Sequence, residues 1–241
     1  MAITSAPHRG GHTARRGQLA VIAAVTAAFI LATLAVVLLV RGAGPSSPGI
    51  QGSGIAAAQT RTVAGFSGLD LAGSNNVTVV VGAPQSVVVR ADSNLISHVT
   101  TQVVGGTLVI GDTGSFTTRA PMSVEVSVPS LTRLNLSGDG QISVTGINVP
   151  RLAVTVSGSG LLSAAGTATQ LDVTLSGDGQ AQLFQLTARD VHAVVTGSGL
   201  IQVTATTSLD ADVSGSGAIT YSGNPPQVTT NITGIGSITP G

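Results

Sequence analysis

Two aspartates and one histidine form the arrangement in this sequence that is most typical of acid/base chemistry. Asp172, His192 and Asp210 each lie five residues before the first glycine of a recurring segment, Ser/Thr-Gly-x-Gly. Residues at one position of successive repeats stack on neighbouring strands about 4.8 Å apart. We therefore expect the imidazole of His192 to lie between two carboxylates, the kind of group that polysaccharide-processing enzymes use as acid and base.

The same three side chains also fit a solvated polar ladder on the outside of a sheet. In such a ladder, opposite charges on adjacent strands relieve one another. Aromatic residues make up only 2% of the chain, and we find no aromatic platform for a sugar ring near these positions. We therefore predict a non-catalytic polar face and keep a polysaccharide-processing enzyme as the alternative.

The recurring segment occurs six times, at intervals of 18 to 20 residues. Its first glycines are Gly138, Gly158, Gly177, Gly197, Gly215 and Gly234, and its second glycines are Gly140, Gly160, Gly179, Gly199, Gly217 and Gly236. A fixed period of about this length is typical of stacked structural repeats. We expect the glycines to permit backbone angles that are closed to other residues.

The residues that flank each segment predict two strands that meet at a corner. The residue two before the first glycine is always aliphatic, and the residue four after it is always apolar. One such unit cannot bury its own apolar row, but stacked units can, with their strands in parallel. The sequence thus predicts an all-β solenoid with coils of about 19 residues. We expect about nine coils.

The N-terminal part of the chain has a different composition. Residues 1–18 are polar and contain three arginines, and residues 19–40 form an uncharged apolar segment. A helix of that length spans about 33 Å, which matches the hydrocarbon core of a bilayer. Arginines before the segment favour a cytoplasmic N-terminus. Residues 41–60, rich in Gly, Pro, Ser and Ala, then read as a flexible stalk before a domain at 61–241.

A cleaved signal peptide is the competing interpretation of residues 19–40. The apolar region of a signal peptide is normally shorter, about 7–15 residues, and is followed by a cleavage site with small residues. Here the segment is longer and ends at Arg41, without a clear cleavage site. We therefore predict an uncleaved single-pass anchor.

The composition excludes several kinds of chemistry and partner. The chain has no cysteine, which excludes disulfides, zinc–thiolate sites and thiol nucleophiles, and no lysine, which excludes Schiff-base chemistry. From residue 42 onward, six arginines and ten acids leave a formal charge of −4. An acidic domain with few aromatic residues argues against nucleic acid as a partner.

Two of the repeated segments carry an aspartate in the middle, Asp139 and Asp178. Glycine–aspartate turns occur in calcium-binding repeats, but Ca²⁺ takes six to eight oxygen ligands. These two residues lie two coils, or about 10 Å, apart, too far to share an ion. Aspartate is also an ordinary turn residue. We predict neither a metal nor a cofactor.

The strand sequences resemble a known family. Phe66-Ser67-Gly68-Leu69-Asp70-Leu71, Asn75-Asn76-Val77-Thr78-Val79 and Val124-Glu125-Val126-Ser127-Val128-Pro129, followed by repeated L-x-L-S-G-x-G, are similar to the auto-transporter adhesin head GIN domain. The resemblance covers about residues 62–241. It implies a right-handed parallel β-helix on the outside of bacterial cells, often behind a signal or an anchor. It carries over no catalytic residue.

The sequence therefore predicts a single-pass membrane protein of the bacterial cell envelope. Its N-terminus is cytoplasmic, and its extracytoplasmic solenoid serves as an adhesin or interaction scaffold toward a cell-surface glycan or protein. The alternatives are the polysaccharide-processing enzyme and a structural or sensory partner of another membrane protein, paired through the end of the solenoid. The oligomeric state is left open.

The anchor is tested by the N-terminal sequence of the protein isolated from membranes. We expect residues 19–40 to be retained and the chain to extract only with detergent. A mature chain that starts near residue 44 would show cleavage and contradict the anchor.

Overall fold

The computed structural model describes residues 49–241. The predicted cytoplasmic segment 1–18 and the predicted anchor 19–40 lie outside this range. Within the described range, no helix is long and apolar enough to cross a membrane. The described domain is all-β, as predicted, and forms a solenoid of about five turns with coils of about 20 residues.

Seventeen strands make up the domain. They are β1 (Ile50–Gln51), β2 (Ala56–Thr60), β3 (Gly68–Leu71), β4 (Asn76–Val81), β5 (Ser86–Asp92), β6 (Val99–Val104), β7 (Thr107–Asp112), β8 (Phe116–Thr117), β9 (Ser123–Val128), β10 (Arg133–Leu136), β11 (Gln141–Val156), β12 (Leu161–Leu175), β13 (Gln180–Val195), β14 (Leu200–Val213), β15 (Ala218–Ser222), β16 (Gln227–Ile232) and β17 (Ser237–Pro240).

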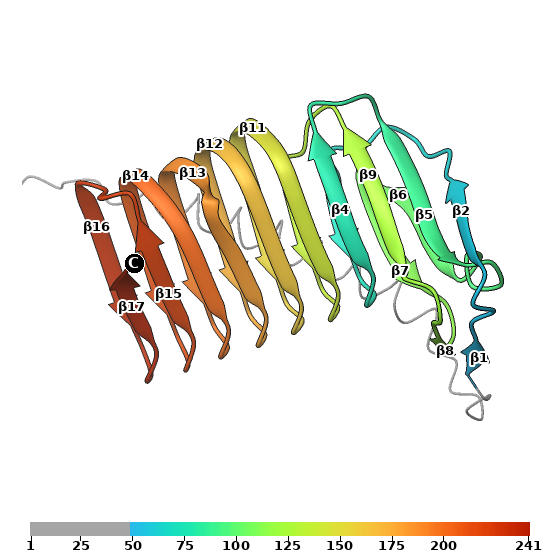
Figure 1. Ribbon diagram of the computed structural model, residues 1–241. Helices are drawn as coiled ribbons and strands as arrows, with labels where there is room; N and C mark the ends of the chain where they lie inside the picture. Colours follow the sequence, from blue (N-terminus) through green and yellow to red (C-terminus); the bar gives the residue numbers. More distant parts are fainter. Residues whose placement is uncertain (1–48) are drawn as a thin grey trace, which may run out of the picture. The chain divides into compact units, whose positions relative to one another are not determined.

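The regular part of the solenoid is built from the long strands β11 to β14, which bend along their length and pair in parallel (Figure 1). Each strand begins just after one Ser/Thr-Gly-x-Gly turn and ends just before the next. Because every coil has nearly the same length, equivalent residues of successive coils become direct neighbours. The repeat in the sequence is thereby converted into rows of stacked side chains.

Apolar residues at alternating positions of these strands form the core. One row contains Val77, Ile142, Leu162, Ala181, Ile201 and Ile219, and all of its side chains are buried. A second row contains Leu71, Leu136, Val156, Leu175, Val195 and Val213. Burial of each such Leu, Ile or Val side chain contributes about 1.5–3 kcal/mol, so the aliphatic rows hold the coils together without aromatic residues.

The turn glycines are needed for a reason other than the predicted one. Of the twelve, only Gly234 has a left-handed φ, of 132°. A Cβ atom on Gly158 would instead overlap the carbonyl oxygen of Gly138 in the preceding coil, and one on Gly179 would lie 2.7 Å from the oxygen of Gly160. The turns are stacked so closely that backbone occupies the space of a side chain.

Backbone hydrogen bonds join the stacked turns. The amide of Leu161 donates to the oxygen of Gly140 at 3.1 Å, and the amide of Gln180 donates to Gly160 at 3.0 Å. Small differences in coil length are absorbed at the opposite bend, where the pairing of β11 with β12 shifts register between Val144 and Ile147. There Gly146 does adopt a left-handed φ, of 81°.

The N-terminal part of the domain departs from the regular coil. Strands β3 and β4 form a unit with neighbouring strands on both sides. β3 lies between β7 and β10, and β4 lies between β9 and β11. After β4 the chain reverses direction. β5 therefore pairs antiparallel with β9, and β6 pairs antiparallel with β7. The expectation of nine coils was therefore wrong, because this region does not follow the repeat.

The described part of the predicted stalk is also ordered. β1 pairs with β8, and β2 pairs antiparallel with β5, so residues 50–60 belong to the folded domain. The buried carboxylate of Asp92 ties this segment down. It accepts hydrogen bonds from the amides of Gly54 (2.6 Å), Arg119 (2.9 Å) and Ala120 (3.1 Å). Glycine, proline and serine indicated flexibility here, whereas tertiary hydrogen bonds order the segment.

Replacement of Gly158 by alanine tests the close stacking of the turns. We expect Gly158→Ala to lower the free energy of unfolding by about 1–3 kcal/mol, because the new methyl group displaces the neighbouring turn. Urea unfolding followed by circular dichroism measures the loss. The control is Ser159→Ala in the same turn, which is exposed and should change stability by less than about 0.5 kcal/mol. Equal effects of the two substitutions would contradict the stacking.

Asp92→Asn tests the role of the buried carboxylate. The amide group cannot accept all three backbone hydrogen bonds, so we expect the Tm at pH 7 to fall by roughly 3–10 °C. Asp178→Asn, at an exposed turn position, is the control, with an expected shift of about 1 °C or less.

The effect of Asp92 should depend on pH. The amide of Arg119, together with those of Ala120 and Gly54, holds the pKa of the Asp92 carboxyl below its ordinary value. Its contribution to stability is therefore complete above the unfolded-state pKa of about 3.9 and is lost as the pH falls through the lower folded-state pKa. The difference in Tm between wild type and Asp92→Asn should shrink in that range. A difference that grows at acidic pH would contradict this assignment.

Candidate functional site

Asp172, His192 and Asp210 lie on the outer face of the second half of strands β12, β13 and β14. Asp172 pairs with His192 in the register of β12 and β13, and His192 pairs with Asp210 in that of β13 and β14. The structure thus brings the three residues together in one row across three coils. Inward-facing neighbours such as Val173 and Ala193 are buried in the core, which fixes the outward direction of the row.

The two carboxylates have different partners. Asp172 accepts a hydrogen bond from Nε of Arg151 at 2.9 Å, and Nη2 of Arg151 lies 2.9 Å from the same oxygen. Nδ1 of His192 lies 3.4 Å from Oδ2 of Asp210. The histidine therefore approaches one carboxylate, while the other is bound by an arginine that the sequence analysis did not connect with it.

A third acidic residue joins His192 and Asp210. Asp212 lies two residues beyond Asp210 on β14 and therefore on the same face. The ligand atoms of His192, Asp210 and Asp212 all lie within 4.8 Å of one another. The sequence-based site omitted Asp212, although its spacing from Asp210 could have indicated it. These three residues are the group in the described domain that could hold a metal ion.

The environment of this face does not favour acid/base catalysis. The side chains of His192 and Asp210 are 46% and 58% exposed, so bulk water surrounds them. Catalytic acids and bases usually lie in clefts where burial tunes their pKa values. One surface cavity is lined by ten residues drawn from β11 to β14, and another by residues between Thr60 and Val87. Neither His192 nor Asp210 lines either cavity.

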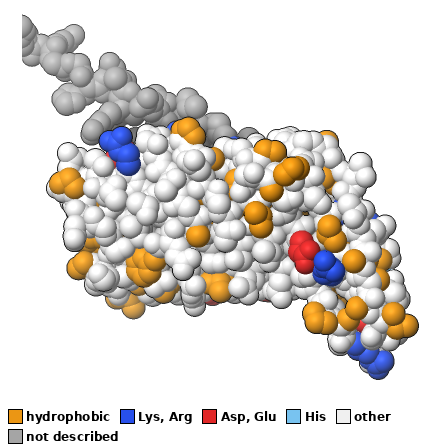
Figure 2. All heavy atoms as spheres, turned by 45° about the horizontal axis from the view of Figure 1, so that its top comes forward, with side chains coloured by type: hydrophobic (Ala, Val, Ile, Leu, Met, Phe, Trp, Pro, Cys, Tyr) orange, Lys and Arg blue, Asp and Glu red, His pale blue; other side chains and the backbone are white. Residues whose placement is uncertain are grey.

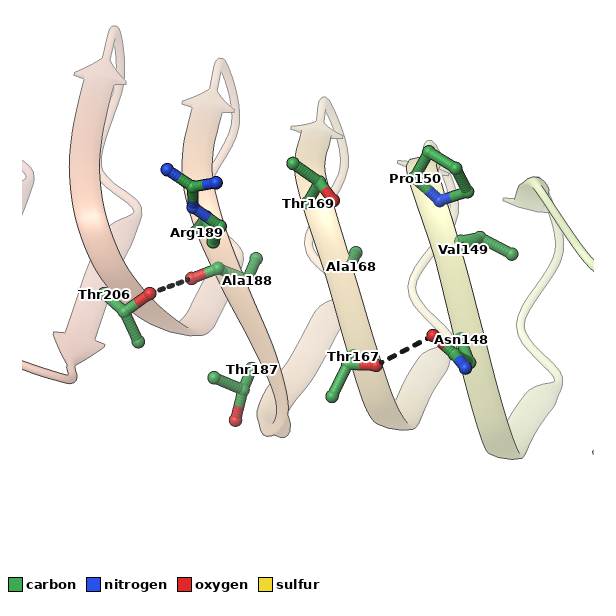
Figure 3. A pocket seen from close by; sticks show the side chains of 10 residues that line it. All are labelled: Asn148, Val149, Pro150, Thr167, Ala168, Thr169, Thr187, Ala188, Arg189 and Thr206. Atoms are coloured by element: carbon green, nitrogen blue, oxygen red, sulfur yellow. Dashed lines mark hydrogen bonds between the residues drawn. The ribbon is translucent and has the colours of Figure 1, made fainter.

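A shallow groove lies beside the opposite bend and crosses four coils (Figure 3). It has a volume of about 410 Å³ and opens to solvent. Each of β11, β12 and β13 contributes three consecutive residues to it, and β14 contributes Thr206. The lining residues are Asn148, Val149, Pro150, Thr167, Ala168, Thr169, Thr187, Ala188, Arg189 and Thr206.

The groove presents hydroxyl and amide groups in successive coils. Asn148, Thr167 and Thr187 occupy paired positions on β11, β12 and β13 and are exposed. Oγ1 of Thr167 donates to Oδ1 of Asn148 at 3.3 Å, and Oγ1 of Thr206 donates to the oxygen of Ala188 at 3.2 Å. Arg189 adds a positive charge at one side (Figure 3). This ladder of neutral hydrogen-bonding groups was not recognised in the sequence.

One face of the domain carries few charges. Figure 2 shows a face composed mainly of uncharged polar side chains and backbone, with small scattered apolar groups and very few charged ones.

Asp70, which the sequence analysis used only as part of the family motif, is buried on β3. Burial raises the pKa of its carboxyl, and hydrogen bonds from Asn135 and Ser137 partly oppose that shift. Asp70 thus has a structural position rather than one open to a ligand.

The chain matches a protein-family model and several solved structures. The model described as "Putative auto-transporter adhesin, head GIN domain" matches residues 65–225. The chain belongs to this family. The resemblance seen in the strand and turn motifs is therefore confirmed. No curated protein matches the chain.

Several solved structures share the fold of this chain. An adhesin described as putative from Bacteroides fragilis has a TM-score of 0.66 and 22% identity, and the match covers 80% of this chain and all of that one. A putative adhesin from Parabacteroides distasonis has a TM-score of 0.53 and 21% identity, and a putative lipid binding protein from the same species has 0.52 and 22%. For both, the match covers 80% of this chain and all of the other. At these identities the matches show the fold alone. None of the descriptions names a catalytic activity.

Proposed function

We propose that the head GIN domain of this protein is a non-catalytic adhesion or interaction module of the bacterial cell envelope. In this proposal, residues 19–40 anchor the chain in the membrane, residues 1–18 are cytoplasmic, and the solenoid, with the right hand that the family implies, lies outside. Membership of an adhesin family and the uncharged 22-residue segment support this arrangement.

The observation that carries the proposal is the groove across β11 to β14. Its hydroxyl and amide groups recur from coil to coil, about 4.8 Å apart, and it is open to solvent. Such a surface suits an extended ligand that offers hydrogen bonds at regular intervals, such as a surface glycan or a polar peptide segment. Because the backbone is held in a sheet, the ladder is preorganised and little entropy is lost on binding.

A polysaccharide-processing enzyme is the second candidate, and the approach of His192 to Asp210 favours it. Against it stand the exposure of both side chains and the engagement of Asp172 by Arg151. A glycan that binds without being cleaved would support the adhesin, whereas turnover that is lost in His192→Ala would support the enzyme.

A binding screen with matched variants of the full-length chain tests the proposal. The detergent-purified protein is applied to glycan arrays and to bacterial and host cell surfaces, and bound ligands are then titrated. We expect Thr167→Arg, which fills the groove with a long charged side chain, to weaken binding at least about tenfold, a loss of about 1.4 kcal/mol.

Thr174→Arg is the matched control, because Thr174 is an exposed threonine on the same strand, β12, but outside the groove. It should bind as wild type does. Equal losses in the two variants, or turnover of the ligand, would contradict the proposal. A lack of binding to all of these surfaces would favour a scaffold role toward another membrane protein.

A further inference from the structure

We propose that His192, Asp210 and Asp212 form a binding site for a divalent transition-metal ion, with Zn²⁺ as the best fit. The site lies on the outer face of β13 and β14. It is separate from the groove and independent of the adhesin proposal. It also departs from the sequence-based expectation that the chain binds no metal.

The separation of two donor atoms is the first observation. Nδ1 of His192 and Oδ2 of Asp210 are 3.4 Å apart, which is longer than a well-formed charge-assisted hydrogen bond. Two ligands of a tetrahedral zinc ion with bonds of about 2.1 Å lie about 3.4 Å from each other. The pair is therefore spaced as two ligands of one ion are spaced.

The third ligand comes from the same strand. The donor atoms of Asp212 lie within 4.8 Å of those of His192 and Asp210. Because these side chains are exposed or only half-buried, small changes in their χ angles within one rotamer would shorten that distance without disturbing the core. The backbone positions are held by the paired strands, so the ligands need little further organisation.

The carboxylate of Asp212 is also oriented from outside the group. Nδ2 of Asn231, on the neighbouring strand β16, donates to Oδ1 of Asp212 at 3.1 Å. Carboxylates that bind metals are typically held in this way by an outer hydrogen bond. The bond engages one of the two carboxylate oxygens, so Asp212 keeps a second oxygen for an ion.

The distribution of charge on this face also favours a bound cation. Asp172 is neutralised by Arg151, and Asp190 accepts a hydrogen bond from Oγ of Ser208 at 2.7 Å. Asp210 and Asp212 instead place two carboxylates side by side on one strand. Among the described residues, Asp210 has His192 as its side-chain partner, and Asp212 has Asn231. A divalent cation would remove the repulsion between the two carboxylates.

The donor set selects the metal. One imidazole nitrogen and two carboxylate oxygens suit Zn²⁺, Ni²⁺ and Cu²⁺, whereas Ca²⁺ requires six to eight oxygen ligands and Mg²⁺ prefers an octahedron of oxygens. Three protein ligands leave at least one position of a zinc ion for water. We therefore expect saturable binding of Zn²⁺ and Co²⁺, with little response to Ca²⁺ or Mg²⁺.

Isothermal titration with Zn²⁺ and visible absorption with Co²⁺ test the site. The full-length chain is used without a histidine tag and with His8→Ala and His12→Ala, because those histidines of the N-terminal segment could bind metal independently. We expect one ion per chain and a Co²⁺ spectrum with the intense bands of a tetrahedral site. His192→Ala and Asp212→Asn should each weaken binding at least about tenfold.

Two further variants separate a specific site from general attraction to an acidic surface. Asp172→Asn removes a carboxylate from the same face but not from the site, and it should bind as the parent does. Asn231→Ala keeps all three ligands but removes the outer hydrogen bond, and it should weaken binding about tenfold. Absence of saturable binding, or undiminished binding by His192→Ala, would overturn the proposal. So would equal losses in Asp172→Asn and Asp212→Asn.

Discussion

The direct stacking of one backbone turn on another is the constraint on which this structure depends. At each Ser/Thr-Gly-x-Gly corner, the carbonyl oxygen of one coil occupies the space that a Cβ atom of the next would need, as between Gly138 and Gly158. Backbone hydrogen bonds from coil to coil then hold the corners together. Close stacking at the corner keeps the strands in register, and the register aligns the aliphatic rows that form the core.

The same register produces the surface features. Polar residues that recur at one position of the repeat form a ladder along the solenoid, as in the hydroxyl groups of the groove and the row of Asp172, His192 and Asp210. Because each strand exposes every second residue and the core uses the others, these ladders are open and shallow. In the described part of the chain, His192 and Asp210 therefore lie on an open surface rather than in an enclosed, desolvated cleft of the kind that tunes catalytic groups.

Irregularity is concentrated at the N-terminal part of the domain. There the chain places the unit of β3 and β4 between two others and then reverses direction through β5 and β6. Asp92 joins three backbone amides from two separate segments. The aliphatic core continues through this region, and the buried contacts of Asp92 add to it where the repeated turns are absent.

The sequence by itself determined the solenoid, because a repeat of about 19 residues with alternating apolar positions can bury its core only by stacking. It also determined the alignment of Asp172, His192 and Asp210, since that alignment follows from the repeat register. The tertiary structure alone decided the order of the N-terminal units, the ordering of residues 50–60 and the pairing of Asp172 with Arg151. It also showed that the turn glycines are required by contact with the preceding coil rather than by their φ angles. These features depend on contacts between residues distant in the chain, and such contacts leave no periodic pattern in the sequence.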